Sequence, residues 1–255
     1  MNRYVVVMTA CIDPSKGEYR LNRADPTVRL EDYRTALRFW LRFPDERISN
    51  ILFIDNSNYP LDNLEATAKR ENPLNKHLEF ISLDCNWYPP GGHYGYAELR
   101  MLDLGLERSR LRDATSHMIK VSGRFTFPSL TRLLDRLPAE FDAVADARAW
   151  RTLRRRHEHP QVTTQIILFA HEFYKRHLQD CYRDLESGDI SHMEAIYYRK
   201  LAQLSAENKI ILRFPCNVSP VGFPAHRNRP YSHPMQVAAN RFRAIARRIL
   251  PNWWI

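Results

Sequence analysis

The chain has 255 residues and is 44% hydrophobic, which is enough to bury the core of one large α/β domain. It contains no apolar stretch of the roughly 18 residues that cross a bilayer, and its four single cysteines form no C-x-x-C pair, so neither a membrane-spanning helix nor a zinc or disulfide framework is expected. The formal charge of +9 indicates a surface that attracts polyanions such as nucleic acid, anionic lipid headgroups or nucleotide-sugar phosphates.

The first part of the chain alternates between predicted strands and helices. Residues 4–12 form an apolar, β-branched run, which is the pattern of a strand buried on both faces. Apolar residues at helical spacing predict a helix over residues 30–43. A second buried strand is predicted over 48–54, a helix over 62–70 and a third strand over 78–83. This order predicts βαβ units and a parallel sheet.

A glycine-rich loop over residues 89–98 leads into a predicted helix that ends near residue 107. Such loops let a ligand approach the backbone closely. Four further elements are predicted after it, namely strands over 117–121 and 141–147 and helices over 165–178 and 192–204. Because no internal repeat or low-complexity linker interrupts residues 1–234, we expect them to form one domain.

The C-terminal part differs in composition. Residues 215–234 hold five of the sixteen prolines and predict an irregular loop lying across the site. Residues 235–255 predict a basic amphipathic helix, with arginines on one side and Phe, Ile, Leu and two Trp residues on the other. Such a helix suits a membrane interface, and packing on the domain is the alternative.

Polar residues stand at the carboxyl ends of the first two predicted strands, where open α/β sheets bind ligands. Thr9 lies in the first strand, and Asp55, Asn56 and Ser57 end the second. We predict that these residues bind a nucleotide, with Asp55 and Asn56 contacting its base or ribose. The alternative is a simple turn, because Asp, Asn and Ser are common in turns.

Glu98 follows Gly95 at the end of the glycine-rich loop. Its carboxylate is a candidate general base for an acceptor hydroxyl or a partner for a donor sugar hydroxyl, and Gly95 is a candidate binding residue. The alternative is that Glu98 is an acid that favours a helix N-terminus.

Residues 120–124 place two cations and a hydroxyl around a glycine. Alternate positions of a strand project to one side, so we predict that Lys120, Ser122, Gly123 and Arg124 cradle a diphosphate leaving group. A solvated basic strand edge is the alternative.

With these residues in view, the chain resembles a family of bacterial capsule and O-antigen glycosyltransferases of GT-A-like fold. The similarity runs from about residue 4 to residue 235, and the order of the short motifs carries it. The matching segments are residues 9–14, 54–57, 94–98, 119–125, 142–148, 163–165, 173–174 and 193–194.

The resemblance implies a GT-A-like, Rossmann-like, mostly parallel sheet flanked by helices. It implies that the protein transfers a sugar from a nucleotide-sugar donor to a lipid-linked or oligosaccharide acceptor at the cytoplasmic membrane face. Carried over by position, Lys120 and Arg124 would contact the donor phosphates, and Glu98 or Glu194 would be the acid/base residue.

The sequence has no clear Asp-x-Asp pair at a strand end, which is the usual clamp for Mn²⁺ or Mg²⁺ in metal-dependent glycosyltransferases. Asp146 is followed by Arg148 where the second acid would stand. We therefore expect a metal-independent enzyme without a cofactor, in which Lys120 and Arg124 replace the ion. Asp146, a third catalytic candidate, keeps a metal-dependent alternative open.

Two other functions stay open from the sequence. The charge of +9 would suit a nucleic-acid-binding or nucleic-acid-processing protein, although we expect no nucleic-acid partner, and the C-terminal helix would suit a non-catalytic scaffold of a polysaccharide assembly complex. The first apolar run is too short for a credible signal peptide, so we expect a cytoplasmic protein. Peripheral binding to the inner face of the membrane is expected if the C-terminal helix binds the membrane and not if it packs on the domain.

Overall fold

The computed structural model describes most of the chain. Residues 149–160, which include a basic run, and residues 250–255, the end of the predicted C-terminal helix, lie outside the described residues. The described residues are 2–17, 21–148, 161–186, 192–224, 230–231 and 233–249.

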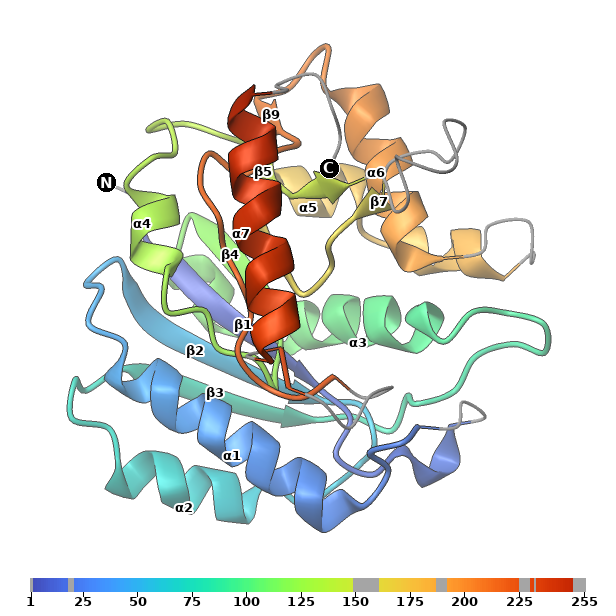
Figure 1. Ribbon diagram of the computed structural model, residues 1–255. Helices are drawn as coiled ribbons and strands as arrows, with labels where there is room; N and C mark the ends of the chain where they lie inside the picture. Colours follow the sequence, from blue (N-terminus) through green and yellow to red (C-terminus); the bar gives the residue numbers. More distant parts are fainter. Residues whose placement is uncertain are drawn as a thin grey trace.

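A seven-stranded sheet of order β3-β2-β1-β4-β8-β5-β9 forms the centre of the fold (Figure 1). Its first four strands run parallel, as predicted. They are β1 (Tyr4–Ala10), β2 (Ile48–Asp55), β3 (His77–Ser82) and β4 (His117–Ser122). Thr9 pairs with both Ile54 and Ser122, and Ala10 pairs with Asp55. The carboxyl ends of β1, β2 and β4 therefore meet at one edge of the sheet.

The other three strands of the sheet are β8, with five residues, and β5 and β9, with two residues each. β8 (Ile166–Ala170) runs antiparallel to both β4 and β5 (Ala143–Val144), and β9 (Ile210–Ile211) runs parallel to β5. A separate ribbon pairs β6 (Ala147–Arg148) with β7 (Gln161–Val162).

The helix predicted over residues 165–178 is wrong in its first part. Residues 166–170 form strand β8, and helix α5 begins only at His171. The sequence Ile-Ile-Leu-Phe-Ala is apolar at every position, and its first four residues are buried, so its pattern fits a buried strand as well as a buried helix. Pairing with β4 on one side and β5 on the other selects the strand.

Helices cover both faces of the sheet. Alternate residues of β1 point to opposite sides, so Val6 and Met8 pack with α1, α2 and α4, whereas Val5 and Val7 pack with α3, α5 and α6. Figure 1 shows α1 and α2 on the side of the sheet opposite α3. The helices are α1 (Pro26–Arg42), α2 (Asp62–Arg70), α3 (Gly95–Arg108), α4 (Leu130–Leu134), α5 (His171–His177), α6 (Met193–Leu204) and α7 (Pro234–Ile249), with 3-10 turns at Pro14–Lys16, Leu111–Ala114 and Cys181–Leu185.

Local sequence fixes the bounds of α1. The Asp25 carboxylate accepts hydrogen bonds from the backbone N–H groups of Thr27 (2.7 Å) and Val28 (3.3 Å), and Pro26 occupies the first turn, where no N–H is needed. The helix ends before Pro44 and buries Trp40 completely against β1 and β2. This packing holds the N-terminal turns of α1 beside the carboxyl end of β1.

The predicted C-terminal helix is present as α7, which the structure describes as far as Ile249. Its Asn240 side chain is buried and donates a hydrogen bond to the Ser219 hydroxyl at 3.1 Å. Across the described part of the chain, no helix has the length and apolarity that crossing a membrane requires.

Candidate active site

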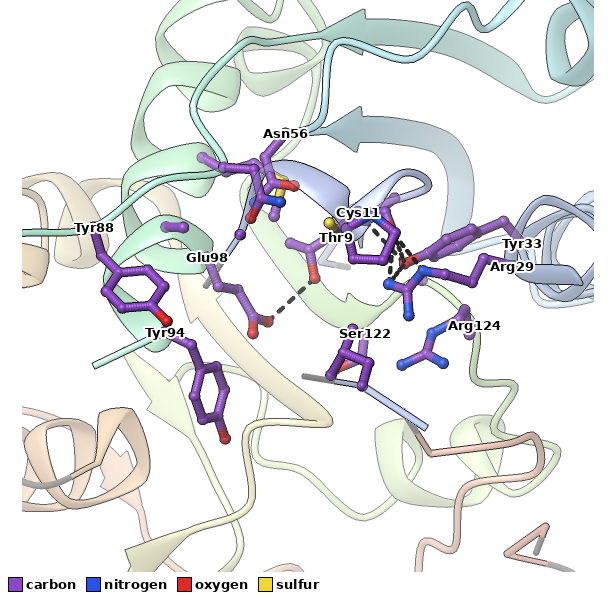
Figure 2. A pocket seen from close by; sticks show the side chains of 18 residues that line it. Thr9, Cys11, Arg29, Tyr33, Asn56, Tyr88, Tyr94, Glu98, Ser122 and Arg124 are labelled. Atoms are coloured by element: carbon purple, nitrogen blue, oxygen red, sulfur yellow. Dashed lines mark hydrogen bonds between the residues drawn. The ribbon is translucent and has the colours of Figure 1, made fainter. Parts of the chain in front are cut away.

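A cavity of about 220 Å³ lies at the shared carboxyl ends of β1, β2 and β4, between α1 and the start of α3. Figure 2 shows Arg29 and Arg124 at one end of it and Tyr88 and Tyr94 at the other, with the Glu98 carboxylate pointing into the space between them. Six of the predicted site residues line this cavity, namely Thr9, Asn56, Glu98, Ser122, Gly123 and Arg124.

Arg124 brings a buried guanidinium to the cavity, and it lies 5.9 Å from the ring centroids of Tyr33 and Phe125. Its Nη1 atom is buried and has no hydrogen-bond partner among the described residues. Burial lowers the pKa of the guanidinium from its ordinary value, while Tyr33 and Asp32 partly oppose this effect and Arg29 adds to it. Arginine nevertheless stays protonated in proteins, so the site holds a desolvated positive charge. Such a charge is the complement of a bound anion.

Arg29 is the second cation of this end, and the sequence analysis missed it. It is 2% exposed, and its guanidinium donates to the carbonyl oxygens of Cys11 (2.7 Å from Nε) and Arg23 (3.0 Å) and to the Tyr33 hydroxyl (3.3 Å). These bonds fix the loop that follows β1. The predicted helix over residues 30–43 begins one residue too late to include Arg29, which stands one helical turn before Tyr33 in the observed α1.

Gly123 allows β4 to turn across the end of β1. Its backbone N–H donates to the Thr9 carbonyl oxygen at 2.8 Å, and a Cβ atom at this position would lie 2.8 Å from the same oxygen. A backbone carbonyl cannot move aside as a flexible side chain can. The close approach places Ser122 and Arg124 on either side of the turn.

Lys120 does not line the cavity, but it binds Glu98, which does. It is 1% exposed, and its ammonium donates to the Glu98 carboxylate and to the Thr164 carbonyl oxygen at 2.8 Å. The Thr9 hydroxyl donates to the same Glu98 oxygen at 3.3 Å. Glu98 keeps 25% of its side chain exposed. The ion pair therefore orients a carboxylate that substrate can reach.

Glu194 lies behind this pair, as the first acid of helix α6. It accepts a hydrogen bond from the Thr164 hydroxyl at 3.3 Å, and Thr164 also binds Lys120 through its carbonyl. Burial raises the pKa of Glu194, and the Glu98 carboxylate adds to that rise. Two of the three predicted catalytic acids are thus brought together around one lysine.

Asp146, the third, stands apart from the cavity. It is 1% exposed and accepts hydrogen bonds from Arg148 Nε at 2.7 Å and from the backbone N–H of Phe214 at 3.4 Å. These contacts tie the β6 ribbon to the segment after β9. In this structure Asp146 serves as an anchor for the backbone.

Asp55 is also occupied with the backbone. It is fully buried, and its carboxylate accepts hydrogen bonds from the N–H groups of Ile12 (2.7 Å), Ser57 (2.8 Å) and Tyr59 (3.2 Å) and from the Ser57 hydroxyl (2.8 Å). It joins the loops after β1 and β2 and does not line the cavity. The neighbouring Asn56 does, and its buried Oδ1 atom lacks a partner within the described part of the chain.

Gly95 lies at the first turn of α3, outside the cavity lining. A Cβ atom there would stand 2.7 Å from the Cβ of Met193, so the residue lets α3 and α6 begin side by side. His93 and His192, which the sequence analysis did not single out, flank this contact with ring nitrogens 3.4 Å apart. Burial and His192 lower the pKa of His93 to about 4, so His93 is neutral at physiological pH.

The donor atoms at the end of β4 do not fit a divalent metal ion. Mn²⁺ and Mg²⁺ take mainly carboxylate and other oxygen ligands, whereas this position offers Ser122, Gly123 and the Arg124 cation. Of the residues that the structure describes, no three or more His, Cys, Asp or Glu side chains gather where they could hold a metal ion.

Comparison with solved structures identifies the fold. No protein-family model and no curated protein matches the sequence. The mannosyltransferase PcManGT from Pyrobaculum calidifontis, in complex with GDP-Man and Mn²⁺, has a TM-score of 0.50 and 11% identity, with 96% of this chain and 62% of that chain covered. Core-mannan synthase A from Aspergillus fumigatus, in its Mn/GDP form, has a TM-score of 0.50 and 8% identity, with 88% and 75% covered.

The inositol-1-phosphate CTP transferase from T. maritima is also similar, with a TM-score of 0.48, 12% identity and coverage of 89% of this chain and 92% of that chain. At these identities the likeness to the first two structures shows the fold alone. The predicted GT-A-like fold, a mostly parallel sheet flanked by helices, is confirmed.

Replacing Asp55 tests whether it is a structural residue. The Asp55→Ala variant leaves several buried donors without an acceptor, each worth about 1–3 kcal/mol, so the free energy of unfolding should fall by about 3 kcal/mol or more in urea denaturation. Glu46→Ala, at an exposed acid in the turn before β2, is the control and should change stability by less than about 0.5 kcal/mol. A stable Asp55→Ala protein would contradict this role.

Proposed function

We propose that the protein is a glycosyltransferase that binds a nucleotide-sugar donor in the cavity at the ends of β1, β2 and β4. The observation that carries the proposal is the buried, unpartnered Nη1 atom of Arg124 at this edge of a GT-A-like sheet, described above for the residues that the structure covers. A desolvated guanidinium needs an anion with several acceptor oxygens, and a diphosphate supplies it.

Different residues of the cavity would bind different parts of the nucleotide-sugar donor. Arg124, supported by the charge of Arg29 and by the Ser122 hydroxyl, would hold the diphosphate. Asn56, whose Oδ1 atom has no partner within the described residues, would accept a hydrogen bond from the base or ribose. Lys120 is not part of this phosphate site, because its ammonium is bound to Glu98 and Thr164.

Glu98 is the residue that we place at the reacting centre. The acceptor hydroxyl oxygen forms a bond to the anomeric carbon of the donor sugar, and the bond from that carbon to the phosphate oxygen breaks. The electron pair of that bond leaves with the nucleoside diphosphate beside Arg124, and the hydroxyl proton passes to the Glu98 carboxylate. Lys120 acts as a positioning residue whose ion pair keeps the Glu98 carboxylate aimed into the cavity.

The proposed reaction needs no metal ion, because the fixed charge of Arg124 stands where the leaving group develops negative charge. The donor chemistry at the end of β4 supports this. The two structural neighbours bind GDP-Man with Mn²⁺ or GDP with Mn, so the proposal predicts a difference from them in metal requirement.

We further propose a lipid-linked or oligosaccharide acceptor of bacterial surface polysaccharide, capsule or O-antigen, at the cytoplasmic face of the membrane. The motifs between residues 9 and 194 support this proposal, because their order resembles that of the capsule and O-antigen glycosyltransferases. Their positions support it as well, because several of the motifs meet at the cavity. The segments around Thr9, Asn56, Glu98 and Arg124 line one cavity, and Glu194 stands directly behind it.

Nucleotide binding tests the donor site. A panel of UDP, GDP, CDP, ADP, TDP and CMP, each with and without Mn²⁺, should produce selective thermal stabilisation by one base, independent of metal. A ligand at 100 times its Kd adds about 2.7 kcal/mol to the free energy of unfolding, which a melting curve resolves. No shift with any nucleotide, together with salt-sensitive binding to DNA or RNA, would replace the proposal with the nucleic-acid function.

The Arg124→Met variant separates binding from stability. Loss of charge-assisted hydrogen bonds, worth about 1.5–3 kcal/mol, should weaken binding of the selected nucleotide by about 10- to 100-fold in calorimetry. The ligand-free variant should melt at the wild-type temperature or above it, because a buried cation with an unsatisfied Nη1 atom has been removed. Arg110→Met, at an exposed arginine, should change neither quantity. Unchanged affinity in Arg124→Met would contradict the phosphate role.

The Glu98→Gln variant tests the chemical step. Release of nucleoside diphosphate from the matching nucleotide sugar, with a bacterial membrane lipid extract as acceptor, should fall by about 10²- to 10⁴-fold. Nucleotide-induced stabilisation should persist, which shows that the donor site is intact. Glu186→Gln, at an exposed acid outside the cavity, serves as the control. Equal loss of nucleotide binding and turnover would make Glu98 a structural residue.

A further inference from the structure

Three large apolar side chains of helix α7 are exposed to solvent. Phe242 is 69% exposed, Ile245 57% and Ile249 70%. These positions are three and four residues apart, so they lie on one face of the helix, and the exposed Ala238 extends that face by another turn. We call Phe242, Ile245 and Ile249 the α7 stripe.

Among the α7 side chains that the structure describes, the two buried ones are small or polar. Asn240 is 8% exposed and bonds to Ser219, and Ala246 is 9% exposed. A helix on the surface of a globular protein normally points its apolar stripe inward and its polar face outward. In α7 the large apolar residues point outward, which marks a surface that contacts something other than water.

The charge of α7 indicates what that contact is. The helix holds four arginines and no acid, and so carries nearly half of the formal net charge of +9. Arg241, next to Phe242 in the chain, is exposed. An apolar stripe on a basic helix is the pattern of helices that lie in the interface of an anionic membrane. Nucleic acid would be attracted by the charge but would leave the stripe uncovered.

We propose that α7 docks the protein on an anionic lipid bilayer, with its axis in the membrane plane and the α7 stripe at the boundary of the acyl chains. This inference stands on the helix itself and does not depend on the reaction in the cavity.

The segment before α7 links this surface to the site. Val221 pairs with Thr126 through backbone hydrogen bonds of 2.9 and 3.0 Å, and the ring of Tyr231 contacts that of Phe125, with centroids 5.3 Å apart. Phe125 directly follows Arg124. Docking of α7 would therefore fix the orientation of the cavity relative to the membrane, as a membrane-bound acceptor requires.

Vesicle sedimentation tests the proposal on the full chain. The protein should sediment with vesicles that contain phosphatidylglycerol and not with vesicles of phosphatidylcholine alone, and added salt should weaken the binding by screening the arginines. The Phe242→Ser, Ile245→Ser double variant should bind at least about tenfold more weakly, because burial of large apolar side chains is lost. Both side chains are exposed, so the variant should keep the wild-type melting temperature.

A matched control carries Val28→Ser and Leu74→Ser, two exposed apolar residues on other elements, and should bind like the wild type. Failure of the wild type to bind anionic vesicles, or equal weakening in both double variants, would overturn the proposal. So would a wild-type dimer that the α7 variant converts to a monomer in light scattering, because the stripe would then be a subunit interface. The α7 variant should keep nucleotide-induced stabilisation, so this test and that of the donor site fail separately.

Discussion

Lys120 is only 1% exposed, so its ammonium needs compensating partners inside the protein. The arrangement of the elements around the cavity depends on these partners. Its partners come from two other parts of the chain, the carboxylate of Glu98 on α3 and the carbonyl of Thr164 before β8. The contact therefore fixes α3 and the β8 connection against β4, and Thr164 passes the constraint on to Glu194. Removing one member of such a buried pair leaves the other uncompensated, which usually costs about 3–5 kcal/mol.

Arg124 stands only four residues further along the chain and is the opposite case. The Nη1 atom of Arg124 is buried and lacks a hydrogen-bond partner in the described structure. Burial and the nearby Arg29 and Arg23 disfavour the charge of its guanidinium. Folding alone gains little from this arrangement. A bound diphosphate would satisfy it, so the destabilisation carried by the free protein becomes affinity when the ligand binds. Lys120 holds α3 and the β8 connection in place, whereas Arg124 would bind the substrate.

Local sequence pattern predicted the order of the elements and the edge of the sheet where the site lies, because both depend on apolar periodicity and on where strands end. It did not determine which partner a side chain meets. An acid after a strand looks the same whether it faces a ligand or, like Asp55, gives its oxygens to the backbone of Ile12, Ser57 and Tyr59. For the same reason β8 was predicted as a helix, since its apolar run fits both states until β4 and β5 pair with it.

Two basic regions, the cavity arginines and helix α7, give the charge of +9 a specific meaning. A protein that binds nucleic acid along its surface needs exposed cations that track a phosphate backbone. Here Arg29 and Arg124 line a partly open cavity of about 220 Å³, while the arginines of α7 belong to the helix that carries the exposed α7 stripe. In our proposals the first arrangement binds a small anion and the second an anionic surface with an apolar interior. A transferase that takes a nucleotide sugar from solution and an acceptor from a membrane requires both.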